Sequence, residues 1–166
     1  MREVLKGFAV ACLVVLASSG LAAGSDSADD RATLAGLTKL SVVVEDLAPV
    51  AARSGLSTAT IQSDVEGRLR KAGIALVPDA DAYLYVHVTV ADAGAASALP
   101  FVVEVALVQE VTLPRGVRTR TPVQVPTWSL NRLGMASADL LRTSVTSRVD
   151  EFVESFIRAY QSVNPK

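Results

Sequence analysis

Residues Tyr83–Val90, YLYVHVTV, alternate tyrosine, histidine and threonine with aliphatic side chains. Successive side chains of a β-strand point to opposite faces of a sheet, so this alternation predicts a half-buried strand. One face carries Leu84, Val86, Val88 and Val90, and the other carries Tyr83, Tyr85, His87 and Thr89. The stretch therefore predicts a sheet with one covered face and one open face.

A second strand is predicted at 101–113, FVVEVALVQEVTL, after a loop of small residues. Closing that loop symmetrically places Val90 opposite Phe101, and therefore His87 opposite Glu104. Glu110 falls on the same face as Glu104. A neighbouring carboxylate favours protonated His87, so the pair predicts a pH-sensitive contact. The alternative is a polar cross-strand pair that keeps the open face solvated.

The remaining elements follow from hydrophobic periodicity and turn residues. Strands are predicted at 40–47, 74–77 and 123–130, and helices at 58–72 and 137–163. The last helix has an apolar stripe at spacings of three or four: Leu141, Val145, Val149, Phe152, Phe156, Tyr160 and Val163. The order β-α-β-β-β-β-α predicts an α+β two-layer sandwich. Its mostly antiparallel sheet of about five strands has both helices on one face, one of them the long C-terminal helix.

The first 24 residues have the layout of a secretory signal peptide: a basic start, an apolar core and then small residues. Cleavage after Ala22 and cleavage after Gly24 both fit. Residues 25–36 are then predicted to be a flexible leader, and 37–166 a single domain. Two alternatives remain: an uncleaved anchor, at the short limit for a bilayer span, and a lipoprotein, in which Ala9 stands where a leucine-like residue belongs before Cys12.

Export restricts the chemistry of the mature chain. Cys12 is the one cysteine and leaves with the signal peptide, and His87 is the one histidine. Disulfides, thiol nucleophiles, Cys/His zinc sites and paired-histidine hydrolases are therefore excluded, and we expect no cofactor or metal. The formal net charge of −1 becomes −2 because two basic residues and one acidic residue are removed, which argues against nucleic-acid binding.

Three other clusters have two interpretations each. Arg115, Arg118 and Arg120 form a basic turn that either contacts anionic headgroups or an acidic partner, or is a soluble hairpin tip. The carboxylate pairs Glu45–Asp46 and Asp79–Asp81 lack the spacing of a calcium loop, so we assign them to loop solvation and capping. Trp128 has no assigned face because Pro126 breaks the alternation.

Several segments together, VVVEDLAP, AYLYVHV, VALVQEVTLPR, PTWSL and the terminal VDEFVESFIRAYQSVNPK, resemble a family of small uncharacterised exported bacterial proteins. The resemblance implies an exported single-domain protein and supplies no activity or site residues. The element order is similar to small α/β domains of the bacterial envelope, such as the N-terminal domain of the Tol–Pal propeller protein and outer-membrane assembly lipoproteins. Those domains mostly bind partners, but the similarity is one of fold, and a fold does not by itself determine function.

These observations predict a non-enzymatic periplasmic or secreted module that binds a protein or envelope component through its open face or an exposed edge strand. After signal cleavage no transmembrane span is expected, and the oligomeric state is open. A first alternative is a carrier with a pocket for a small apolar ligand between the sheet and the long helix. A second is a hydrolase using Glu104 or Glu110 with His87, which requires a deep cleft.

Overall fold

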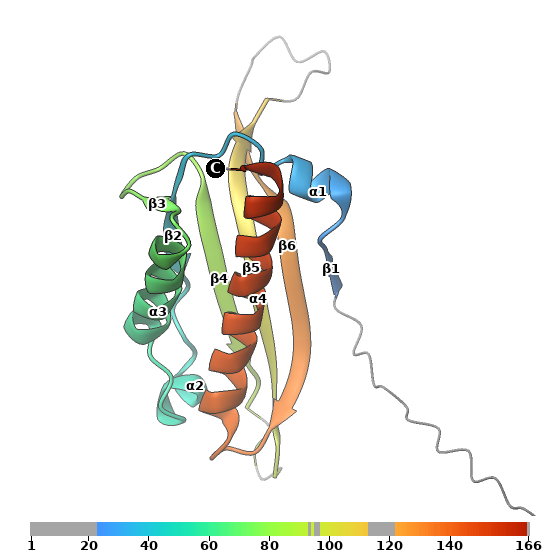
Figure 1. Cartoon of the computed structure of the whole chain (residues 1–166). Coiled ribbons are helices and arrows are strands. Elements are labelled where there is room, and N and C mark those ends of the chain that lie inside the picture. Colours follow the sequence, from blue (N-terminus) through green and yellow to red (C-terminus); the bar gives the residue numbers. More distant parts are fainter. Residues whose placement is uncertain (1–22, 93, 95–96, 113–121, 166) are drawn as a thin grey trace, which may run out of the picture.

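A computed structural model describes residues 23–92, 94, 97–112 and 122–165. Its elements are β1 (Ala23–Ser25), α1 (Ala28–Ala32), β2 (Lys39–Val44), α2 (Pro49–Arg53), α3 (Thr58–Lys71), β3 (Ala75–Leu76), β4 (Tyr83–Val90), β5 (Leu99–Val111), β6 (Val123–Ala136) and α4 (Leu141–Val163). The strands form one open sheet in the order β1-β6-β5-β4-β2-β3, and α3 and α4 lie across one of its faces (Figure 1). The predicted α+β two-layer architecture is confirmed.

The three long strands form the expected antiparallel meander. β4 pairs with β5 in the predicted register, with Val90 opposite Phe101 and His87 opposite Glu104. β5 pairs in turn with β6, and a register shift follows Leu107 where the chain reaches Pro126 on β6. Proline has no N–H to give to the ladder, so the irregularity at this point has a direct physical cause.

On the other side of β4 the strand pairings are parallel, whereas the sequence predicts a mostly antiparallel sheet. β2 pairs in parallel with both β3 and β4. The chain leaves β2 through α2 and α3 before returning as β3, and a crossover through a helix is the connection that parallel strands require. The sheet is therefore mixed, and the carboxyl end of β2 lies beside the middle of β4, where Val44 pairs with Val86.

The core lies between the sheet and the two long helices. The predicted stripe of α4 is buried from Leu141 to Phe156 and partly buried at Tyr160 and Val163. Phe152 and Phe156 are at most 1% exposed and share the core with Leu84 and Val103, which are fully buried. Trp128 also faces the helices, where its ring meets Phe156 edge-on at 5.3 Å between centroids. The side chain of Ser57 caps the N-terminus of α3 by accepting a hydrogen bond from the amide of Thr60. No helix among the described residues is long and apolar enough to cross a bilayer.

The N-terminal segment differs from the flexible leader expected over 25–36. β1 pairs with the outer edge of β6, and Ser27 caps the N-terminus of α1 in a capping box with Asp30. Leu34 is fully buried in the core. The segment was missed because it is short and polar and supplies one buried apolar side chain, too few to produce a periodic pattern. The predicted signal peptide falls on residues of which 1–22 lie outside the described part, so it stays a prediction.

Candidate interaction face

The open face is the sheet surface opposite α3 and α4. Alternation along β4 places Tyr83, Tyr85 and His87 on this face, each half-buried. Their neighbours on the covered face, such as Leu84 and Val86, are fully buried. The predicted division of β4 into a covered and an open face is therefore confirmed.

A polar cluster joins β4 to the end of β2, and we call its members Glu45, Tyr85, His87 and Thr89 the Glu45 cluster. The hydroxyl of Tyr85 donates a hydrogen bond to Oε2 of Glu45. The same oxygen lies 3.5 Å from Nε2 of His87, which in turn lies 3.1 Å from Oγ1 of Thr89. One carboxylate thus bonds Tyr85 and lies beside the ring of His87, while the side chains of His87 and Glu45 remain 37% and 47% exposed.

The backbone of β2 brings Glu45 to this position. Val44 is the register partner of Val86, and the next amide, that of Glu45, donates to the carbonyl oxygen of Val86 at 3.0 Å. Parallel pairing therefore carries Glu45 alongside His87. The assignment of Glu45 to loop solvation was wrong, since its carboxylate joins two side chains of the neighbouring strand.

Glu45 also raises the pKa of Tyr85. Its carboxylate accepts the phenolic hydrogen bond, and together with partial burial and the charges of Glu45 and Glu104 it raises the pKa of Tyr85 to about 12. Tyr85 is therefore a neutral hydrogen-bond donor at physiological pH. An anchored donor of this kind suits recognition, because its hydroxyl and ring are held before a partner arrives.

Neither predicted carboxylate of β5 makes a hydrogen bond or ion pair with His87 among the described residues. Glu104 is the register partner of His87, but the carboxylate within 4 Å of Nε2 of His87 is that of Glu45. Glu110 lies two residues beyond Val108, the partner of Tyr83, and borders a cavity of about 270 Å³ at that end of the sheet. The expected His87–Glu104 contact is therefore replaced by one with Glu45.

The sequence carries only part of the signal that places Glu45. The predicted order of strand 40–47, helix 58–72 and strand 74–77 is that of a parallel crossover unit, which points to the parallel pairing of β2 with β3. The partners of Glu45 lie on β4, and the strand order does not place β4 on the other side of β2. Arg115, Arg118 and Arg120 of the basic turn lie outside the described residues, so both interpretations of that turn stay open.

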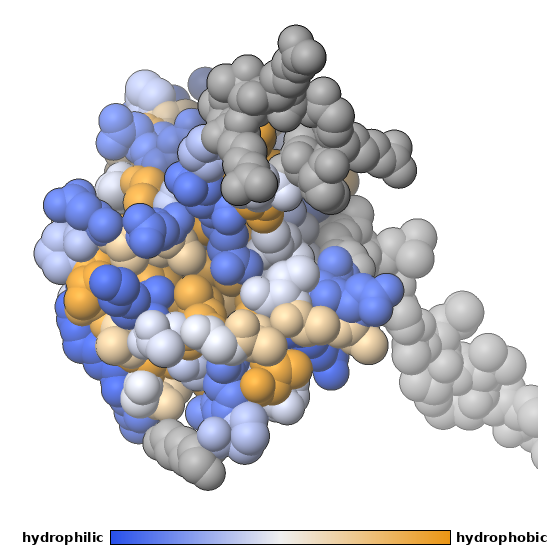
Figure 2. Space-filling view, turned by 90° about the horizontal axis from the view of Figure 1, so that it is seen from above, coloured by the Kyte–Doolittle hydropathy of each residue, from blue (hydrophilic) through white to orange (hydrophobic). Residues whose placement is uncertain are grey.

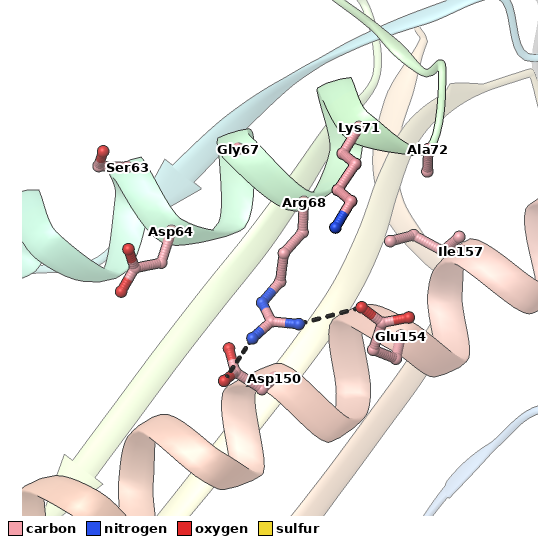
Figure 3. A pocket seen from close by; sticks show the side chains of 9 residues that line it. All are labelled: Ser63, Asp64, Gly67, Arg68, Lys71, Ala72, Asp150, Glu154 and Ile157. Carbon is pink, nitrogen blue, oxygen red and sulfur yellow. Dashed lines mark hydrogen bonds and ion pairs between the residues drawn. The ribbon is translucent and has the colours of Figure 1, made fainter.

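A second polar surface lies between α3 and α4, where a cavity of about 710 Å³ opens to solvent (Figure 3). Arg68 points from α3 toward α4 and contacts Asp150 at 2.7 Å and Glu154 at 3.0 Å. Arg68 is thus paired with two carboxylates of the same molecule, and these two contacts join α3 to α4. No group of three or more side chains among the described residues is placed to hold a metal ion.

The end of the molecule near the C-terminus has a further cavity of about 530 Å³, bordered by Leu37, Gly73, Tyr160 and Asn164. Figure 2 views this end, where apolar patches are interrupted by hydrophilic side chains. The hydroxyl of Tyr160 donates a hydrogen bond to the carbonyl oxygen of Leu37, and the side-chain amide of Asn164 donates one to that of Leu34. Both bonds join the C-terminal end of the chain to the N-terminal segment. This cavity therefore lies beside a structural junction.

No protein-family model and no curated protein matches the chain. Among solved structures, it is similar to rare lipoprotein B from Shewanella oneidensis, with 14% sequence identity and a TM-score of 0.33. The match covers 75% of this chain and 94% of that one. A likeness at this level establishes neither a shared family nor a shared function. The expected similarity to the Tol–Pal propeller domain is not shown.

Proposed function

We propose that the chain is an exported, non-enzymatic module that binds a protein or envelope component through its open face. The observation that carries this proposal is the Glu45 cluster. The carboxylate of Glu45 holds Tyr85 by a hydrogen bond and lies 3.5 Å from the ring of His87, on a sheet surface that no described helix covers. Ordering a ring side chain before binding lowers the entropy lost on association.

The chemistry of the cluster favours binding over catalysis. A tyrosine whose pKa is about 12 is a poor general base, and the partners of His87 are a carboxylate and a threonine hydroxyl at the surface. The alternative hydrolase requires Glu104 or Glu110 to reach His87 in a deep cleft. Since His87 contacts Glu45 instead, the proposal assigns these residues to recognition.

The alternative of a small-ligand carrier needs an apolar pocket between the sheet and α4. That space is occupied by side chains that are at most 1% exposed, among them Val105, Leu107 and Phe152. The cavity of about 710 Å³ lies instead between the two helices and is bordered by charged residues. These observations favour surface recognition over ligand storage.

Export remains part of the proposal, and β1 favours one of the two cleavage positions. β1 begins at Ala23, whose register partner on β6 is Asn131. Cleavage after Ala22 leaves β1 whole, whereas cleavage after Gly24 removes all but Ser25. We therefore propose Ala23 as the first residue of the mature chain.

Crosslinking and affinity capture from intact cells test the proposed face. Wild-type protein is compared with Tyr85→Ala, which removes the anchored ring, and with Asp64→Ala, a matched control on the helix side. We expect wild type and Asp64→Ala to capture the same specific component, and Tyr85→Ala to lose it. Equal capture by all three folded proteins would contradict the proposal. Circular dichroism melting verifies that each variant is folded.

A further inference from the structure

The outer edge of β6 is paired along only part of its length. On this outer edge β1 pairs with Ser129, Leu130 and Asn131. Beyond Asn131 β5 still pairs with the inner edge of Arg132–Ala136, but no described strand lies along their outer edge (Figure 1). An unpaired edge presents a row of backbone N–H and C=O groups that another extended segment can bond. We call Arg132–Ala136 the free edge.

The free edge is apolar on its open-face side. Leu133 and Met135 are each 68% exposed, and Val102, the register partner of Leu133, is 36% exposed. Gly134 lies between Leu133 and Met135, and a Cβ on it would overlap the ring of Phe101 on the covered side. The exposed apolar residues on either side of Gly134 offer an incoming strand contact area on the open face.

The covered side of the free edge has an excess of positive charge. The guanidinium groups of Arg132 and Arg148 lie over the ring of Phe152, at 6.0 and 5.9 Å from its centroid. They share one carboxylate, that of Glu151, at 3.5 and 2.5 Å respectively. Nε of Arg132 is also buried without a hydrogen-bond partner among the described residues. Because two guanidinium groups share the single carboxylate of Glu151, a further acidic group beside them is favoured.

We propose that the free edge binds an extended segment of a partner protein by strand addition. Alternate residues of that segment are apolar, where they meet Leu133 and Met135, and acidic, where they face Arg132 and Arg148. Backbone hydrogen bonds supply affinity, and the side-chain alternation supplies selectivity. This site goes beyond the proposed function, because it lies at the sheet edge on β6 whereas the Glu45 cluster joins β2 and β4.

Synthetic peptides test this inference on the exported, processed protein. One labelled peptide alternates valine with glutamate, and its matched control has lysine in place of every glutamate. Binding is measured by fluorescence anisotropy, and hydrogen exchange locates it. We expect the glutamate peptide to protect the amides of Arg132–Ala136, and the lysine peptide to bind at least about tenfold more weakly.

Two variants make the test specific. Glu151→Gln removes the competing carboxylate, so it should strengthen binding of the glutamate peptide about twofold to fivefold. Leu133→Asn combined with Met135→Asn removes the apolar contact, so it should weaken binding about tenfold. Tyr85→Ala lies on the open face and should leave peptide binding unchanged, which separates this inference from the proposed function.

Several results would overturn the inference. The inference is wrong if neither peptide protects the amides of the free edge. It is also wrong if the glutamate and lysine peptides bind equally well. Protection that grows with protein concentration alongside a dimer in sedimentation would assign the edge to a second copy of the chain. Protection seen in the unprocessed chain and lost on processing would assign it to the residues that precede β1.

Discussion

Nε1 of Trp128 donates a hydrogen bond to Oδ1 of Asp26 at 2.9 Å, across 102 residues of sequence. The same carboxylate accepts two hydrogen bonds from Arg31, at 2.8 and 2.6 Å. Trp128 is 1% exposed, so its indole N–H has little access to water. Asp26 therefore satisfies a buried donor of the core and ties the N-terminal segment to the domain.

Replacing Asp26 with alanine should lower the free energy of unfolding by about 1 to 3 kcal/mol. The change leaves the indole N–H of Trp128 unpaired and releases Arg31, and unpaired buried donors cost this much. Urea denaturation measures the loss. Asp29→Ala, at an exposed position in the first turn of α1, is the matched control and should change stability little. Equal effects of the two substitutions would contradict this role of Asp26.

The same contact predicts how stability depends on acid. Hydrogen bonds from Arg31 first, and also from Trp128, lower the pKa of Asp26 below its ordinary value of 3.8. A lowered folded-state pKa gives stability that is fully present above 3.8 and is lost as the pH falls through the folded-state value. The difference in unfolding free energy between wild type and Asp26→Asn should therefore be constant at higher pH and shrink below 3.8. A difference that grows in acid would refute the assignment.

The sequence predicted those parts of the fold that depend on long periodic patterns. The alternation of β4 determined its covered and open faces, and the symmetric loop closure placed Val90 opposite Phe101 as observed. The stripe of α4 predicted its buried side. These features are local, since each depends on residues within one strand, one hairpin or one helix.

The contacts that the sequence did not reveal join distant segments. Glu45 meets Tyr85 across 40 residues, and its role depends on β2 being parallel to β4. Asp26 meets Trp128 from a segment without apolar periodicity. A single polar residue carries no pattern of its own, so such contacts become visible only when the order and direction of the strands are known.

Two glycines should respond to alanine in opposite directions. At Gly134 a Cβ overlaps the ring of Phe101, which is 5% exposed and packed in the core, so Gly134→Ala should destabilise by about 1 to 3 kcal/mol. At Gly67 of α3 a Cβ meets nothing within 4 Å, so Gly67→Ala should stabilise by about 0.5 to 1 kcal/mol. Thermal and urea denaturation measure both. The same sign for both substitutions would contradict the packing at Gly134.

Processing of the exported chain should leave Ala23 as its first residue. β1 is three residues long, and removing Ala23 and Gly24 would leave too little backbone to pair with β6. Intact-mass measurement of the protein purified from the exported fraction identifies the terminus. A mature chain that begins at Ser25 would show that β1 is dispensable, and an unprocessed chain would favour the uncleaved anchor.

The Glu45 cluster predicts a spectroscopic signature of the open face. Because Glu45 accepts the hydrogen bond of Tyr85, the pKa of that hydroxyl is raised to about 12, and Glu45→Gln should lower it toward the ordinary value of 10.0. Ultraviolet absorbance follows phenolate formation with pH, and subtracting the titration of Tyr85→Phe isolates the contribution of Tyr85. An unchanged Tyr85 titration in folded Glu45→Gln would show that the carboxylate does not hold the ring. A lowered pKa combined with weaker partner capture would link the anchored hydroxyl to binding.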